Sequence, residues 1–144
     1  MATLRTGLVT QGRAFKPFPQ GTVGVREATY SIAAAFATND IFEMLPVYAG
    51  ETVVGLTLVT DDLDTHGTPT LTLDVGDGDD VDRYMDGVNT GQAGGTAFYG
   101  ANITAAKTIL YKYTADDTID IKAVTGPATS ATSGNITLRA LIAG

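Results

Sequence analysis

The clearest pattern in the chain lies between Thr52 and Val75, where two runs alternate apolar and polar residues. Successive side chains of a β-strand point to opposite sides, so each run predicts a strand with one buried and one exposed face. The segment between the runs is rich in Asp, Gly and Pro, which predicts two antiparallel strands joined by a loop. The residues expected on the buried faces are Val54, Leu56 and Leu58 in the first run and Leu71, Leu73 and Val75 in the second.

The same alternation recurs along most of the chain and predicts further short strands. Strands spaced by ~8–12 residues, with no helix of normal length, are typical of all-β sandwiches and barrels. A chain of 144 residues can bury a core of its own, and about eight strands in such a domain fit an eight-stranded antiparallel β-sandwich wound as a jelly roll. The further strands are predicted over residues 28–36, 41–47, 81–85, 107–114, 118–124 and 135–142.

Residues 1–24 lack the alternation. They contain several glycines, and Pro17 and Pro19 flank Phe18, which excludes a helix there and favours extended backbone. We therefore expect an extended N-terminal arm over 1–24 and a jelly-roll sandwich domain over 25–144. Aromatic side chains are unusual in purely solvated arms, so we expect those of the arm to pack on their own domain or on a neighbour.

A second segment without alternation covers residues 86–106. It contains five glycines and only scattered apolar residues, and it predicts a long loop. Loops of this length are uncommon and often serve function or contact. Phe98 and Tyr99 lie inside it.

The charge of the chain is uneven. The net charge is −7, which argues against general nucleic-acid binding because phosphate contacts need Lys and Arg. Residues 1–26 nevertheless hold four basic residues and no acidic one, so a basic end precedes an acidic body. This asymmetry suggests a contact with a partner, although four bases in such a length also suit a solvated, flexible end. No segment approaches the ~20 apolar residues of a membrane span, and no signal peptide is visible, so we expect no membrane association.

No catalytic chemistry is visible in the sequence. The chain has no cysteine and a single histidine, His66, which lies in a turn and is expected to be an ordinary exposed residue. Nucleophilic catalysis needs a base beside a nucleophile, and nothing in the sequence pairs them. A jelly-roll enzyme of the cupin type would hold its metal with several histidines. We therefore expect no enzymatic activity and no cofactor, with one metal as a possible exception.

The acidic segment DGDDVDRYMD is the candidate metal site. Its aspartates are hard oxygen ligands at close spacing, which suits Ca²⁺. The spacing differs from that of an EF-hand loop, because valine and aspartate occupy its fifth and sixth positions. The alternative is a solvated acidic turn that keeps a sheet edge soluble. The candidate ligands are Asp77, Asp79, Asp80 and Asp82.

The amino-acid sequences of several strand segments resemble those of a known group of proteins. The run VVGLTLVTDDLDTHGTPTLTLDVGDGDDVDRYMDG, followed by LYKYTADDTIDIKAV and later by NITLRALI, resembles small structural proteins of tailed bacteriophages, and most of all their capsid decoration (cement) proteins. The likeness covers about residues 27–142 and contains no catalytic motif. It implies a β-sandwich, commonly a jelly roll, that assembles as a homotrimer on the outer capsid surface of the virion and has no enzymatic activity.

The resemblance makes the major capsid protein and further copies of this chain the expected partners, after synthesis in the host cytoplasm. Each trimer would bridge capsid subunits and oppose the pressure of packaged DNA. The alternatives are another phage part, such as a head fibre or tail subunit, or a carbohydrate-binding sandwich for host attachment. The residues expected to contact the capsid are Arg5, Arg13, Phe15, Lys16 and Phe18, and those expected to contact other subunits are Phe98 and Tyr99.

Overall fold

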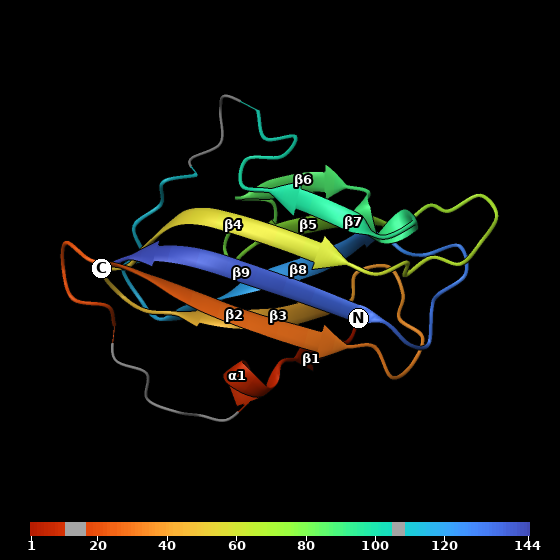
Figure 1. The fold of residues 1–144 in the computed structure, drawn as a ribbon, viewed down its shortest axis with the longest axis horizontal. Coiled ribbons are helices and arrows are strands. Elements are labelled where there is room, and N and C mark those ends of the chain that lie inside the picture. Colours follow the sequence, from red (N-terminus) through yellow and green to blue (C-terminus); the bar gives the residue numbers. More distant parts are fainter. Residues whose placement is uncertain (11–16, 105–108) are drawn as a thin grey trace.

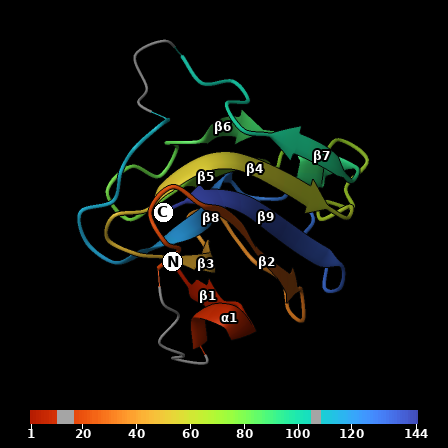
Figure 2. The same cartoon turned by 60° about the vertical axis from the view of Figure 1, so that its left-hand side comes forward.

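The computed structural model describes residues 1–10, 17–104 and 109–144. Two β-sheets face each other and form a sandwich (Figures 1 and 2), so the predicted all-β fold is confirmed. The elements are β1 (Thr3–Arg5), α1 (Gly7–Thr10), β2 (Val23–Ser31), β3 (Ile41–Val47), β4 (Thr52–Thr60), β5 (Thr72–Gly76), β6 (Met85–Val88), the 3₁₀ turn η1 (Thr90–Gln92), β7 (Gly95–Phe98), β8 (Asp117–Thr125) and β9 (Asn135–Ala143).

The strand pairing is that of a jelly roll. One sheet has the order β1-β3-β8-β5-β6 and the other the order β2-β9-β4-β7. From β2 onwards the strands pair from the outside inwards: β2 with β9, β3 with β8, β4 with β7 and β5 with β6, all antiparallel. This nesting is what winding a long antiparallel ribbon into two sheets produces. A ninth strand, β1, extends the first sheet by pairing parallel to β3.

The core lies between the two sheets, where the inward side chains of both meet. The alternation located these side chains correctly in most strands, because one sheet face is buried and the other is exposed. Fully burying each large aliphatic side chain contributes about 1.5–3 kcal/mol. Core side chains in predicted strands include Leu71, Leu73, Val75, Ile119, Ile121, Ile136, Leu138 and Ile142.

The prediction for β4 was wrong at one residue. Leu56 and Leu58 are buried as expected, but Val54 is 38% exposed and Val53 is buried in its place. The register between β4 and β9 shifts between Val53 and Gly55, which marks a β-bulge. An extra residue at a bulge reverses the alternation on one side of it, so a strict period of two fails there.

The expected pairing of the two central strands was also wrong. β4 and β5 lie in different sheets, and their connection crosses from one sheet to the other. Asp64 holds this connection: its buried carboxylate accepts hydrogen bonds from the backbone N–H groups of Thr70, Leu71, Ala128 and Thr129. Burial alone would raise the pKa of Asp64, but these four bonds outweigh it and lower the pKa well below its ordinary value.

The segment 86–106 is not one long loop. It contains most of β6, the turn η1 and the whole of β7. The short strand expected over 81–85 begins only at Met85. Glycine and alanine dominate this segment, and because glycine has no side chain and alanine a small one, the apolar alternation that marks a strand is missing there.

The strand expected over 107–114 is wrong for its described part. Residues 109–114 form no strand, and Lys112 makes only an isolated bridge to Thr52. The alternation of Ile109, Tyr111 and Tyr113 therefore arises without a ladder. These three side chains are partly or fully buried and those of Leu110, Lys112 and Thr114 are exposed, because an extended connection has the same period as a strand.

The strand predicted over residues 28–36 begins earlier than expected. β2 covers Val23–Ser31, so it starts inside the segment predicted as an arm and ends before Phe36. In the described part of the first 24 residues, β1 belongs to a sheet and α1 lies beside it at the lower edge of the sandwich (Figures 1 and 2). This part of the N-terminal segment therefore packs on its own domain.

Candidate functional site

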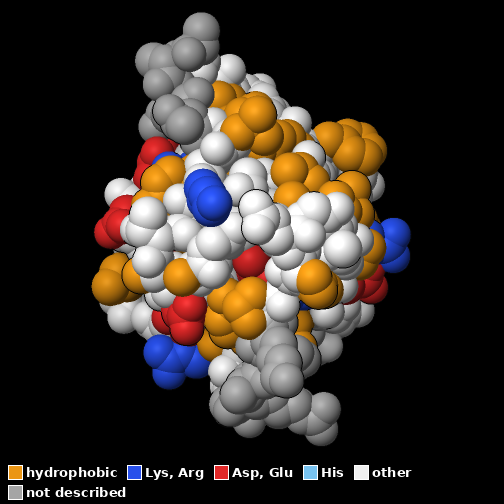
Figure 3. Space-filling view, turned by 90° about the vertical axis from the view of Figure 1, so that its left-hand side faces the viewer, with side chains coloured by type: hydrophobic (Ala, Val, Ile, Leu, Met, Phe, Trp, Pro, Cys, Tyr) orange, Lys and Arg blue, Asp and Glu red, His pale blue; other side chains and the backbone are white. Residues whose placement is uncertain are grey.

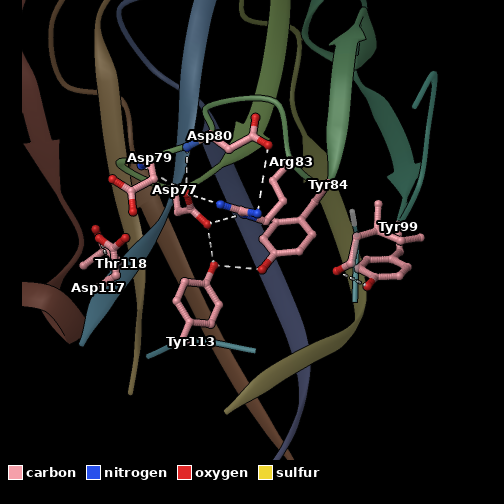
Figure 4. Close-up of polar contacts among 10 residues, drawn as sticks. Asp77, Asp79, Asp80, Arg83, Tyr84, Tyr99, Tyr113, Asp117 and Thr118 are labelled. Carbon is pink, nitrogen blue, oxygen red and sulfur yellow. Dashed lines mark hydrogen bonds and ion pairs between the residues drawn. The ribbon is translucent and has the colours of Figure 1, made fainter. Parts of the chain in front are cut away.

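The acidic segment after β5 folds around Asp77, which is buried (Figure 4). Its carboxylate accepts hydrogen bonds from Arg83 Nε at 2.5 Å and Nη2 at 3.2 Å, and from the Tyr113 hydroxyl at 2.8 Å. The hydroxyl of Tyr113 in turn lies 2.8 Å from that of Tyr84. Both carboxylate oxygens of Asp77 are thus occupied by groups of the protein itself.

The protonation of this cluster is fixed by its surroundings. Burial works to raise the pKa of Asp77, but Arg83 and Tyr113 outweigh it and lower that pKa. Burial raises the pKa of Tyr84 and of Tyr113 above their ordinary range, so both hydroxyls stay protonated. The guanidinium of Arg83 also lies 3.9 Å from the centre of the Tyr111 ring. The cluster thus joins the anion of Asp77, the cation of Arg83 and two protonated tyrosines, and its groups satisfy one another.

The structure separates the four aspartates predicted as calcium ligands. Asp77 pairs with Arg83, Asp79 is exposed, and Asp80 lies 4.0 Å from Arg83. Within the described ranges, the three carboxylates close enough together to hold a metal ion are those of Asp74, Asp82 and Asp86, which can place one oxygen each within 4.8 Å of the others.

The carboxyl of Asp74 is the buried member of that acidic group. Its Oδ1 accepts a hydrogen bond of 2.7 Å from the backbone N–H of Gly87. Burial raises the pKa of Asp74, and the negative charges of Asp86 and Asp82 add to the shift. Of the four predicted ligands, only Asp82 belongs to this group.

The residues predicted for capsid contact have different places. Arg5 is exposed and forms an ion pair with Glu43 across the β1–β3 ladder. Phe18 packs on its own domain, with its ring 4.6 Å from the guanidinium carbon of Arg26 and its backbone N–H donating to Glu51 at 3.0 Å. Arg13, Phe15 and Lys16 lie outside the described residues.

A buried ion pair holds the N-terminal segment, and the sequence analysis missed it. Arg26 is 7% exposed and donates to Glu51 through both terminal nitrogens, at 2.6 and 2.7 Å. The rings of Phe18 and Tyr48 enclose the guanidinium, at 4.6 and 4.9 Å. Burial works to raise the pKa of Glu51, but the bonds from Arg26 and two backbone N–H groups lower it. One signal was available in the sequence. Arg26 lies two residues before Ala28, so in a strand both side chains point to the same, inward face.

The two residues predicted for subunit contact point in different directions. Phe98, at the end of β7, is 63% exposed. Tyr99 is half-buried, and its hydroxyl lies 2.9 Å from the carbonyl oxygen of Val53 and 2.7 Å from that of Ile109. Its ring stacks on that of Tyr84 with centroids 5.8 Å apart. Only Phe98 is therefore placed to meet another molecule, while Tyr99 joins the strands to the connection that follows.

Phe98 forms one wall of a hollow on the outer face of the four-stranded sheet. The hollow has a volume of about 610 Å³, and its apolar lining includes Val25, Gly55 and Leu141. In the end-on view of Figure 3 this sheet lies towards the right, where hydrophobic side chains gather at the upper right. Exposed apolar patches on folded domains are commonly found at interaction surfaces.

The remaining candidate residue behaves as predicted. His66 is exposed, and its Nδ1 lies 2.9 Å from the backbone N–H of Thr68 within the same turn. In the part of the chain that the structure describes, no helix has the length and apolar character needed to cross a bilayer.

The fold defines a class: a jelly-roll sandwich whose buried ion pairs, Arg26–Glu51 and Arg83–Asp77, join parts of its own chain. No family model matches the chain, and no curated relative matches it. Several solved structures do match the chain. A chain of the capsid of Ralstonia phage GP4 superposes with a TM-score of 0.82 at 26% sequence identity, covering 99% of this chain and 97% of that chain.

Two further matches come from other phages. A chain of the cyanophage Pam1 capsid superposes with a TM-score of 0.72 at 29% identity, covering 92% of this chain and 93% of that one. A chain of the Helicobacter pylori bacteriophage KHP30 capsid has a TM-score of 0.50 at 16% identity, over 84% of this chain and 92% of that one, and shows a shared fold. At the level of a phage capsid-related protein, the resemblance noted from the sequence is confirmed.

Proposed function

We propose that this chain is a structural protein of a phage virion that binds the outside of the capsid as a decoration (cement) trimer and stabilises the shell against the pressure of packaged DNA. The observation that carries the proposal is the likeness to a chain of the Ralstonia phage GP4 capsid over nearly the whole length of both chains. The partners are the major capsid protein and further copies of this chain. The role is mechanical and needs neither catalysis nor a cofactor.

The build of the domain supports this role. Copies arranged by symmetry bind a repetitive shell at several points, so weak single contacts add up to firm attachment. A protein under load benefits from a chain end that is tied down, and β1 and the Arg26–Glu51 pair tie the N-terminal segment to the sandwich. Arg5 and Arg26 of that segment are paired with Glu43 and Glu51, so the positive charge proposed to meet the shell is that of Arg13 and Lys16, on an otherwise acidic molecule.

The test is binding to capsids that lack this protein. The purified chain is added to such capsids of its own phage, and bound protein is measured by co-sedimentation, with release of DNA on heating as the readout of shell stability. We expect saturable binding at symmetric sites and a higher release temperature. No binding, or location by electron microscopy only on a tail or a single fibre, would contradict the cement role and favour a head fibre or tail subunit.

The part played by the basic segment has its own matched pair of variants. Lys16→Glu reverses a charge inside the segment, and Lys112→Glu reverses an exposed one outside it. We expect Lys16→Glu to weaken capsid binding without changing the fold. Lys112→Glu should bind as the unmodified protein does. Equal binding by both variants would remove the segment from the proposed contact.

A further inference from the structure

We infer that the outer face of the four-stranded sheet is the contact surface between copies of this chain, with Phe98 of one copy seated in the hollow over Gly55 of the next. The inference rests on the self-association included in the proposed function and names the surface that would carry it. It concerns the free protein, so it can be tested without a capsid.

The strand register divides this face into an apolar and a polar end. Across the sheet, Val25 lies opposite Leu141, which lies opposite Gly55. One step along, Glu27 lies opposite Arg139, and the row continues through Thr57 to Phe98. Beyond that row the face is mostly polar, with the hydroxyls of Thr29 and Thr137 2.8 Å apart and Ser31 bonded to Asn135. Its apolar member is Val59, which lies opposite Thr137 and is 44% exposed. The apolar end is thus bounded on one side.

Gly55 makes the hollow. With no side chain, it leaves the sheet surface open beside Leu141, and a Cβ at Gly55 would come within 3.1 Å of Leu141 Cδ1. The hollow of about 610 Å³ is large enough for an aromatic side chain, since a cavity of roughly 150 Å³ holds a benzene ring. The bulge between Val53 and Gly55 places the glycine there.

Phe98 supplies the matching projection. It is 63% exposed at the end of an edge strand, and its neighbour Tyr99 is anchored inward by its hydroxyl. The anchored tyrosine fixes the backbone, so the phenylalanine is held out from the surface. A rigid aromatic side chain that projects beside an apolar hollow is the usual centre of a protein–protein contact.

The charges of the face identify the occupant as another copy of the chain. The molecule has a net charge of −7, and two such molecules repel wherever their acidic surfaces meet. The four strands of this sheet contain a single acidic residue, Glu27, and it pairs with Arg139 on the same face. Two copies can therefore approach here without repulsion, whereas a basic partner would gain more at the acidic segments.

The contact pairs unlike parts of the face, because Phe98 stands at the rim of the hollow on β7 and enters the next copy's hollow over Gly55, which lies on β4. Such a contact is heterologous and closes into a ring when the rotation between copies allows it. In a closed ring every hollow is filled and every Phe98 is buried. This arrangement agrees with the proposed trimer.

The test uses the full chain and the oligomeric state in solution, measured by light scattering and sedimentation over a range of concentrations. Phe98→Asp removes the projection, and Leu141→Glu places a charge in the wall of the hollow. Leu110→Asp is the matched control, because Leu110 is 65% exposed and lies outside this face. We expect the first two variants to weaken association about 30-fold or more and the control to associate as the unmodified protein does.

Mixing the two weakened variants sharpens the test. Leu141→Glu keeps the projecting Phe98, and Phe98→Asp keeps Gly55 and Leu141 in the hollow, so an equimolar mixture should form dimers that neither variant forms alone. Circular dichroism and thermal melting confirm that each variant is folded. If either variant fails to fold, the other still tests the face.

Each outcome has a separate meaning for the inference and for the proposed function. Unchanged assembly of Phe98→Asp and Leu141→Glu overturns the inference, and capsid binding then still tests the cement role. An unmodified protein that stays monomeric also overturns it, and loss of capsid binding by Phe98→Asp would then assign this face to the shell. Assembly that depends on both residues, in a protein that binds no capsid, supports the inference and contradicts the cement role.

Discussion

Two regions of this molecule bury the same kind of group in different surroundings. At the N-terminal segment, Arg26 pairs with Glu51 between two aromatic rings. At the acidic segment, Arg83 pairs with Asp77 against the ring of Tyr111. In both pairs the guanidinium donates through two nitrogens. The second is surrounded by further carboxylates, including Asp120, whose pKa is raised to about 7.

The difference teaches that an ion pair alone does not decide how a region responds to pH. Glu51 and Asp77 both have lowered pKa values, so each stabilises the fold above its unfolded pKa and loses that effect as the pH falls. Asp120 acts in the opposite direction. We therefore expect the N-terminal pair to contribute most to the free energy of unfolding. The acidic region should contribute most to the change of that free energy with pH near neutrality.

Breaking the N-terminal pair should have the largest effect. Arg26→Met leaves Glu51 buried without its partner, and we expect the free energy of unfolding to fall by about 3–5 kcal/mol, as measured by urea denaturation. The double variant Arg26→Met/Glu51→Leu should recover most of the loss, because no charge remains buried. A single variant as stable as the unmodified protein would show that the pair is not holding the segment.

The hydroxyl of Tyr113 comes next. Tyr113→Phe removes the donor to Asp77 and the acceptor for Tyr84, and we expect a loss of about 1–3 kcal/mol in the free energy of unfolding. Tyr111→Phe is the control, since it keeps a ring beside Arg83. If the two variants melt at the same temperature, the network around Asp77 contributes less than its geometry suggests.

A smaller effect follows from Asp120 and depends on pH. Burial raises its pKa to about 7, and Glu43, Asp117 and Asp77 add to the shift. The folded protein therefore holds this proton more tightly than the unfolded chain. The resulting stabilisation is complete below the unfolded pKa of about 3.9 and is lost as the pH rises through about 7.

Asp120→Asn removes that dependence. Between pH 5 and pH 8 we expect the melting temperature of the unmodified protein to fall relative to that of the variant. Asp79→Asn, at an exposed aspartate of the same region, serves as the control. Parallel curves for the unmodified protein and Asp120→Asn would contradict the raised pKa.

Removal of calcium should have the smallest effect. Arg83 already neutralises Asp77, and the predicted ligands do not converge on one point. We expect the melting temperature and the oligomeric state to be the same with calcium and with a chelator. A rise with calcium that Asp82→Asn abolishes would instead establish a site at Asp74, Asp82 and Asp86.

The outcome for particular residues shows where sequence reasoning ends. Leu73 and Ile121 were placed correctly, because burial on one sheet face imposes a period of two that is visible locally. Phe98 and Tyr99 were predicted together as a contact, yet only Phe98 is exposed for one. This difference depends on the carbonyl groups that the Tyr99 hydroxyl meets, those of Val53, 46 residues away in the chain, and of Ile109 in the connection after β7.

The sequence by itself determined the class of fold and most of the core, because side-chain alternation and turn chemistry act between neighbours in the chain. The resemblance to phage structural proteins came from the likeness of whole strand segments to a known group. Only the tertiary structure decided that β4 and β5 lie in opposite sheets, that Arg26 and Glu51 meet, and that Asp77 is held by Arg83. The first two features require residues far apart in the chain to come together, which is set by how the two sheets pack. Asp77 and Arg83 are six residues apart and meet through the conformation of the connection between β5 and β6.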